Sequence, residues 1–202
     1  MDQTSGRRER KRQQTADLLA DTAFELFEAH GYEAITMEQI AATADVAKGT
    51  LYNHFPVKEA LLRHYFHRQI AEQAPALQEK LERTSDTIER LAVLLQHAAA
   101  WGEEHRRYVP HYLQYRLSQA IKPDCDAERS GTDAVFSRLI GDAQQAGRLR
   151  RDRDTDALVY YFRYLYLAAM TRWLLMPEGR LADELMSMLD LFIAGAGTGE
   201  PS

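Results

Sequence analysis

The residues of this chain that suit a chemical task lie close together, between residues 36 and 58. Lys48 can reach a phosphate or a guanine edge, Thr50 a phosphate or a thymine methyl, and Asn53 has the amide fork that pairs with adenine. Gly49 lets the backbone approach a partner closely. Predicted contacts to the DNA backbone, which position a protein without reading sequence, are Thr36, Tyr52, His54 and Lys58. Taken together, these residue types favour a surface that binds double-stranded DNA.

Two short helices joined by a tight turn are expected to position these side chains. Thr36 and Gln39 have the spacing of a capping box at the start of the first helix, and Asp45 tolerates turn geometry. The second helix, from about residue 48 to 54, turns Leu51 inward and its polar residues outward. This arrangement is a helix-turn-helix, whose second helix can enter the major groove. The alternative is a small helical hairpin with a solvated polar face.

Residues 31–66 closely resemble the DNA-binding domain of the TetR family of transcriptional regulators. The matching pieces are Gly31-Tyr32, Thr36, Ile40-Ala41, Lys48-Gly49-Thr50-Leu51-Tyr52, His54-Phe55 and Lys58-Glu59-Ala60-Leu61. Ala47 and Val57 depart from the family, which usually has a small polar residue at each position. Each missing helix cap costs on the order of 1 kcal/mol. The resemblance implies an all-α fold with an N-terminal three-helix DNA-binding domain and a larger C-terminal helical domain for ligand binding and dimerisation.

This resemblance divides the chain into three parts. Residues 1–60 are expected to form an N-terminal arm and the helix-turn-helix domain, residues 61–196 the effector-binding and dimerisation domain, and residues 197–202 a disordered tail. The arm is expected to follow phosphates or enter the minor groove, although a solvated tail is the alternative. Its basic residues are Arg7, Arg8, Arg10, Lys11 and Arg12, of which Arg8 and Arg10 are predicted DNA contacts.

Residues that typically start or end helices predict the helix boundaries. The first helix is expected from about residue 10 to 30, with Gly31 as a left-handed cap. The fourth is expected from Lys58 to about Gln73, before Pro75. Further helices are expected from Ser85-Asp86, near Pro110, from Thr132 to Gly147, from Asp154 to Met176 and from Leu181 to Ala194.

The C-terminal segment is rich in aromatic residues with polar tips, which suit a pocket for a small organic effector. The predicted effector contacts are Trp101, Tyr108, Tyr112, Tyr115, Phe162, Tyr166 and Trp173. Plain core packing is the alternative for about half of them. The last two helices have wide apolar faces, and in the resembled family they pair with their symmetry mates. The predicted dimer contacts are Tyr164, Leu185, Met188, Leu189 and Phe192.

Composition excludes several other classes of protein. The chain has 202 residues, a formal net charge of −5 and an apolar fraction of 45%. Cys125 is the sole cysteine, which fits a reducing cytoplasm and leaves a redox role open. No apolar run approaches the ~20 residues of a membrane span, and a signal peptide is not expected.

The sequence has no evident enzyme motif or cofactor-binding motif, and no metal site is expected, since His64 and His67 are more typical of packing. The sequence therefore predicts a non-enzymatic, cytoplasmic homodimer that binds a palindromic DNA operator and a small effector, most simply as a repressor. Two alternatives stay open: an activator of the same fold, and a helical enzyme or binding protein with an incidental helix-turn-helix.

Overall fold

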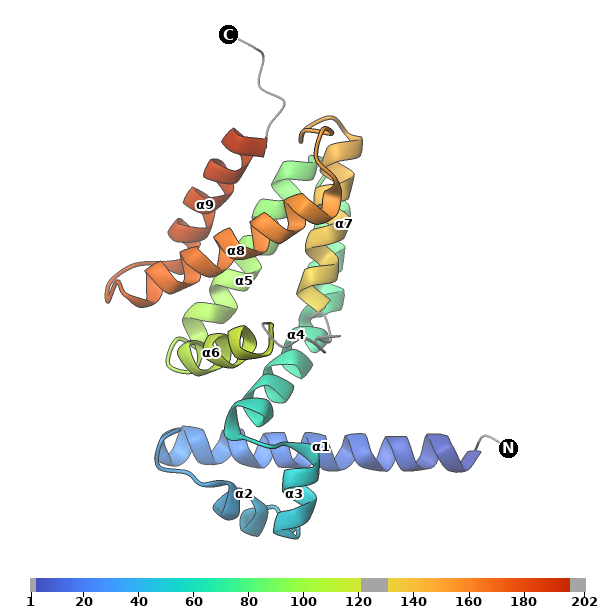
Figure 1. Cartoon of the computed structure of the whole chain (residues 1–202), viewed down its shortest axis with the longest axis vertical. Coiled ribbons are helices and arrows are strands. Elements are labelled where there is room, and N and C mark those ends of the chain that lie inside the picture. Colours follow the sequence, from blue (N-terminus) through green and yellow to red (C-terminus); the bar gives the residue numbers. More distant parts are fainter. Residues whose placement is uncertain (1–2, 121–130, 197–202) are drawn as a thin grey trace. The chain divides into compact units, whose positions relative to one another are not determined.

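The computed structural model describes residues 3–120 and 131–196, and most of these residues lie in helices (Figure 1). This confirms the all-α class. The helices are α1 (Gln3–His30), α2 (Met37–Thr43), α3 (Lys48–His54), α4 (Lys58–Arg83), α5 (Thr87–Glu104), α6 (Val109–Ala120), α7 (Gly131–Gln145), α8 (Thr155–Leu174) and α9 (Leu181–Ala196). Cys125 and the predicted tail, residues 197–202, lie outside the described residues.

The described residues form two compact units, and the first contains residues 3–72 and 111–120. Its centre is the contact between α1 and the first part of α4, where the ring of Phe24 stacks on Tyr65 with centroids 4.0 Å apart. Helix α2 contacts both α1 and α3. Residues 111–120, which are most of α6, belong to this unit, where the Tyr112 ring meets α4 edge-to-face.

A polar seam joins α1 to α4 within the first unit. The His64 Nε2 atom lies 2.7 Å from a carboxylate oxygen of Asp17, and Arg68 pairs with Asp21 through both of its terminal nitrogens. These side chains are only partly buried, so the seam fixes the angle of α4 against α1 and adds modestly to stability.

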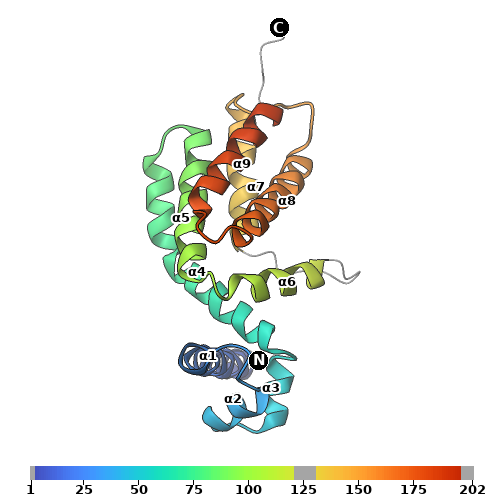
Figure 2. The same cartoon turned by 90° about the vertical axis from the view of Figure 1, so that its left-hand side faces the viewer.

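The second unit contains residues 73–110 and 131–196, in which α5, α7, α8 and α9 form a helical bundle (Figure 2). Helix α9 contacts both α5 and α8, and α7 contacts the same two helices. Side chains buried at the centre of the bundle include Leu91, Leu95, Phe136, Ile140, Phe162, Trp173, Leu181 and Leu185. Burying apolar side chains of this size contributes roughly 1.5–3 kcal/mol each, and this packing holds the bundle together.

Two charged residues of the second unit satisfy backbone groups at helix ends. A Glu103 carboxylate oxygen accepts hydrogen bonds from the backbone nitrogens of Leu181 and Ala182, at 2.7 and 3.3 Å, where α9 begins. Arg106 donates to the carbonyl oxygens of Trp173 and Met176, at 3.0 and 2.7 Å, where α8 ends. Both contacts supply partners for groups that a helix terminus leaves without an intrahelical bond.

The structure corrects two predicted helix boundaries. Helix α1 begins at Gln3 instead of residue 10, so the predicted arm is a helical extension. Helix α4 continues to Arg83 with Pro75 inside it, although Pro75 was expected to end it. A proline removes one backbone donor, but Pro75 is exposed, and water can hydrate the carbonyl left without that donor. Among the described residues, no helix is both long enough and apolar enough to cross a membrane.

Candidate DNA-binding surface

The start of α2 is fixed by the capping box that the sequence predicts. The Thr36 hydroxyl accepts a hydrogen bond from the Gln39 backbone nitrogen at 3.2 Å, and the Gln39 side chain accepts one from the Thr36 backbone nitrogen at 2.8 Å. Ile40 and Ala41 are buried on the inner side of this helix. Local sequence thus sets where α2 begins and which of its faces turns outward.

The turn between α2 and α3 depends on Asp45, which has a φ of 52°. An L residue rarely adopts this left-handed conformation, and aspartate tolerates it better than most. The backbone nitrogen of the next residue, Val46, donates a 3.0 Å hydrogen bond to the Ala41 carbonyl, which closes the turn. Ala47, whose methyl group cannot accept a hydrogen bond, precedes the first residue of α3.

Helix α3 spans the predicted residues, and Leu51 faces inward from it as predicted. Leu51 is completely buried, while Lys48, Gly49, Tyr52 and Asn53 are exposed. Thr50 and His54 are partly buried. The three residues predicted to read bases therefore share one short helix, and a recognition helix must present its side chains in this way.

An acidic residue lies among these predicted DNA contacts. A carboxylate oxygen of Glu38, in the first turn of α2, is 2.5 Å from the Lys48 ammonium and accepts a 3.4 Å hydrogen bond from the Tyr52 hydroxyl. The hydrogen bond from Lys48 lowers the pKa of Glu38, and the same bond raises the pKa of Lys48. Both groups are consequently charged at neutral pH. Sequence reasoning missed this residue, because nothing in the pattern relates position 38 to position 48.

Lys58 is engaged with the protein itself. Its ammonium donates a 2.8 Å hydrogen bond to the Tyr32 carbonyl and lies 4.5 Å from the centre of the Tyr32 ring. His111 of α6 stacks on the same ring, with centroids 4.0 Å apart. Lys58 therefore ties the start of α4 to the segment after α1, and its predicted phosphate contact requires one of its remaining donors.

The remaining predicted backbone contacts are placed differently. His54 is partly buried, and desolvation, followed by the nearby charges of Arg12 and His64, lowers its pKa. It is therefore neutral at pH 7. Arg8 and Arg10 are exposed on the helical extension of α1. Their predicted contacts with DNA phosphates would thus be made from a helix.

The aromatic residues predicted to contact an effector are divided between the two units. Tyr112 and Tyr115 belong to the first unit, in α6, and the other five belong to the second. Phe162 packs edge-to-face against Phe136 and Phe192, and the Trp173 indole donates to the Gly179 carbonyl at 3.0 Å. These two are packed core residues. Trp101, Tyr108 and Tyr112 are also buried, whereas Tyr115 and Tyr166 are partly buried.

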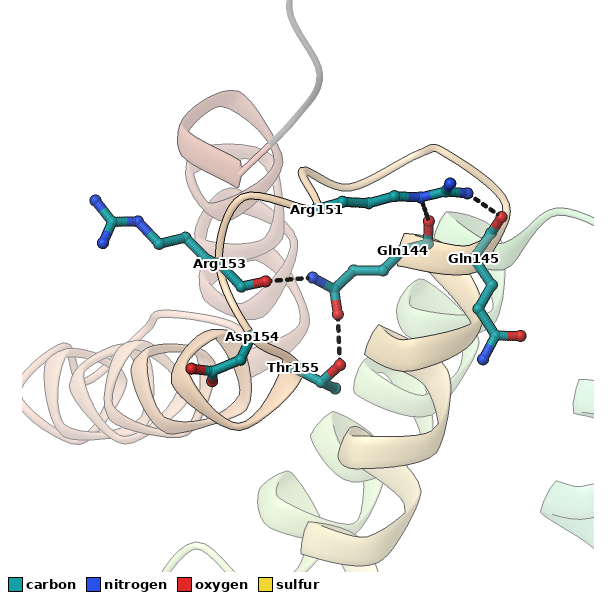
Figure 3. Close-up of a pocket in the computed structure, with 6 residues that line it drawn as sticks. All are labelled: Gln144, Gln145, Arg151, Arg153, Asp154 and Thr155. Atoms are coloured by element: carbon teal, nitrogen blue, oxygen red, sulfur yellow. Dashed lines mark hydrogen bonds between the residues drawn. The ribbon is translucent and has the colours of Figure 1, made fainter.

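A depression of about 540 Å³ lies at the junction of α7 and α8, and none of the predicted effector contacts lines it. It is lined by Gln144, Gln145, Arg151, Arg153, Asp154 and Thr155 (Figure 3). The buried Gln144 amide donates to the Arg150 and Arg153 carbonyls, while its oxygen accepts from the Thr155 hydroxyl at 2.6 Å. These bonds order the connection between the helices, which accounts for the polar residues here.

Four of the five predicted dimer contacts are buried within one subunit. Leu185, Met188, Leu189 and Phe192 are at most 6% exposed, because α5 and α8 of the same chain cover them. Tyr164 is 40% exposed. A different set of apolar residues is open to solvent. These are Tyr160 and Tyr161 on α8, Leu175 directly after α8, and Leu191 on α9.

Comparison with known proteins places this architecture among bacterial regulators. Residues 19–65 match the sequence model described as "Bacterial regulatory proteins, tetR family". The uncharacterized HTH-type transcriptional regulator MT1294 of Mycobacterium tuberculosis is 32% identical over 184 residues, which are 91% of this chain and 86% of that protein.

Two crystal structures show the same fold. The first is Thermus thermophilus FadR, a TetR-family transcriptional repressor in complex with lauroyl-CoA, with a TM-score of 0.74 and 24% identity over 92% of this chain and 97% of that one. The second is RolR in complex with resorcinol, with a TM-score of 0.70 and 22% identity over 96% of this chain and 98% of that one.

Proposed function

Because the chain belongs to the TetR family of transcriptional regulators, we propose that it is a repressor that binds a palindromic operator as a homodimer and leaves it when a small effector binds. The observation that carries this proposal is α3, which buries Leu51 and exposes Lys48 and Asn53 on a helix held by a capped α2. A dimer places two such helices about one DNA turn apart, so the operator has twofold symmetry.

The dimer interface is proposed on the exposed faces of α8 and α9. Tyr161, Tyr164, Ala168, Thr171 and Leu175 are all exposed and follow one another at intervals of three and four. This spacing places them along one side of α8. Ser187, Leu191 and Ala194 are exposed at the same intervals on α9. Apolar residues beside small ones allow two helices to approach their symmetry mates closely.

The proposed effector is a small organic molecule with a large apolar part. The T. thermophilus repressor was solved with lauroyl-CoA and RolR with resorcinol, and both ligands have apolar surface that aromatic side chains can cover. Among the predicted contacts, Tyr112 is well placed to pass on a signal. Its ring meets Phe66 edge-to-face at 5.7 Å, and its hydroxyl lies 3.2 Å from His67 Nε2, so it contacts α4 within the unit that contains α3.

Selection from random-sequence duplexes tests the proposal. The purified protein is expected to enrich a palindrome of two half-sites, and a gel shift with the enriched duplex then gives its affinity relative to a scrambled duplex. An effector identified by thermal shift is expected to weaken the operator complex 5–150-fold, which corresponds to a coupling of ~1–3 kcal/mol. A protein that enriches no sequence is not an operator-binding repressor.

A further inference from the structure

The Glu38 carboxylate is a negative charge among groups that are proposed to contact a polyanion. It holds the Lys48 ammonium at 2.5 Å and accepts a hydrogen bond from Tyr52 through the same oxygen. Lys48 is the positive side chain of α3 that is predicted to read a base. In the free protein the Lys48 ammonium is therefore paired with a carboxylate.

Stability of the fold does not account for this pair. The Lys48 side chain is 61% exposed and that of Glu38 is 52% exposed. Ion pairs between such exposed groups contribute little, because water screens the attraction and two flexible side chains lose freedom. Helices α2 and α3 contact each other, and each has a completely buried residue, Ile40 and Leu51. Glu38 itself lies in the first turn of α2, where a negative charge suits the helix dipole. Its pairing with Lys48, however, bears directly on DNA binding.

We propose that Glu38 determines specificity by suppressing the binding of non-operator DNA, an inference that rests on the proposed operator-binding function. Binding to non-operator DNA is driven by phosphate contacts and the counterions they release. An ammonium that is already paired with a carboxylate gains little from a phosphate, and the carboxylate itself repels phosphates.

Operator binding is affected differently, because an ammonium has three donors. One donor of Lys48 can stay on Glu38 while the others reach O6 and N7 of a guanine. The carboxylate then fixes the direction of the side chain towards the base edge. Glu38 thus lowers the affinity for non-operator DNA, where Lys48 meets only phosphates. It lowers the affinity for the operator little, because a guanine is correctly placed there.

The test is the substitution Glu38→Gln, which removes the charge but keeps an oxygen that can accept from Tyr52. The probes are the duplex enriched by the wild-type protein and a scrambled duplex of the same length and composition. We expect affinity for the scrambled duplex to rise roughly tenfold per subunit near 0.1 M salt, because each freed lysine adds one phosphate contact. The slope of log K against log salt should steepen by about 0.9 per subunit. Operator affinity should change less than threefold.

Two controls separate this inference from simpler effects. In a Lys48→Gln background, Glu38→Gln should leave the salt slope unchanged and raise scrambled-duplex affinity far less than tenfold, because only the repulsion between carboxylate and phosphates is relieved. Glu25→Gln makes the same change of net charge on an exposed position of α1 and should leave both quantities at the wild-type values.

Several outcomes would overturn the inference. These are an unchanged salt slope in Glu38→Gln, an equal gain of affinity for both duplexes, a Glu25→Gln protein that matches Glu38→Gln, or an effect of full size that persists without Lys48. If the wild-type protein does not discriminate between the duplexes, the proposed function itself fails, and this is seen before any variant is made.

Discussion

Leu191 offers the sharpest test of how the chain assembles. It is 65% exposed on α9 in a single subunit, beside Ser187 and Ala194 on the proposed dimer face. Full burial of a leucine side chain contributes roughly 1.5–3 kcal/mol, so covering the exposed two thirds contributes about 1–2 kcal/mol per subunit. Both subunits of a symmetric dimer contribute, which gives about 2–4 kcal/mol. Leu191→Ala should therefore weaken dimerisation roughly 30- to 1,000-fold, at 1.4 kcal/mol for each factor of ten.

Sedimentation equilibrium over a wide range of protein concentration measures this constant. Leu18→Ala is the matched control, because Leu18 is 50% exposed on α1, in the other unit. The control should dimerise like the wild type, and neither variant should unfold at a lower temperature as a monomer, since neither removes a buried group. A wild-type protein that stays monomeric at high micromolar concentration, or a Leu191→Ala protein that dimerises normally, would refute the reasoning.

Three further substitutions test individual contacts. Asn53→Ala should relax the preference at one base pair of each half-site by ~1–3 kcal/mol in competition gel shifts. An equal loss of affinity for every DNA sequence would show that Asn53 does not recognise a base. Lys58→Met should lower the stability of the chain by about 1–2 kcal/mol in urea unfolding, because the Tyr32 carbonyl loses a charged donor. If the slope of log K for DNA binding against log salt decreased in that variant, Lys58 would contact a phosphate as first predicted. Glu103→Ala should cost about 1 kcal/mol in thermal unfolding, since α9 loses the acceptor at its first turn, and an unchanged midpoint would show that water replaces it.

Local features of the fold could be predicted from the sequence, because each depends on a few neighbouring residues. The Thr36–Gln39 capping box and the turn at Asp45 are present as predicted, and Gly31, predicted to be a left-handed cap, has a φ of 89°. A capping box needs only the right spacing, and a positive φ needs only a residue that tolerates it. Predictions of this kind placed the start of α2 directly after Thr36 and placed α3 at about residues 48–54, where the structure has them.

Contacts between residues far apart in the chain could not be predicted in the same way. Glu38 meets Lys48, Lys58 meets the Tyr32 carbonyl, and Tyr32 stacks on His111. Each of these partners was visible as a polar or aromatic residue, but the packing of α2, α3, α4 and α6 decides which ones meet. The interpretation of Lys58 changed for this reason, since a lysine held by a carbonyl is not simply a free phosphate contact.

Helix α8 shows what an aromatic pattern leaves open. Aromatic residues surround this helix, a pattern typical of burial on more than one side, and α8 contacts both α7 and α9. In the single chain, Phe162 and Trp173 are buried, but Tyr161 and Leu175 are 63% and 79% exposed. The predicted dimer contacts on α9 are buried against α5 and α8 of the same chain, and an apolar face in the sequence does not reveal whether its cover comes from the same chain. Single exposed apolar residues are normal on a monomer, but several on one side of a helix mark an interaction surface when they are contiguous. The side of α8 that the single chain leaves open is therefore the reason to look for a second subunit there.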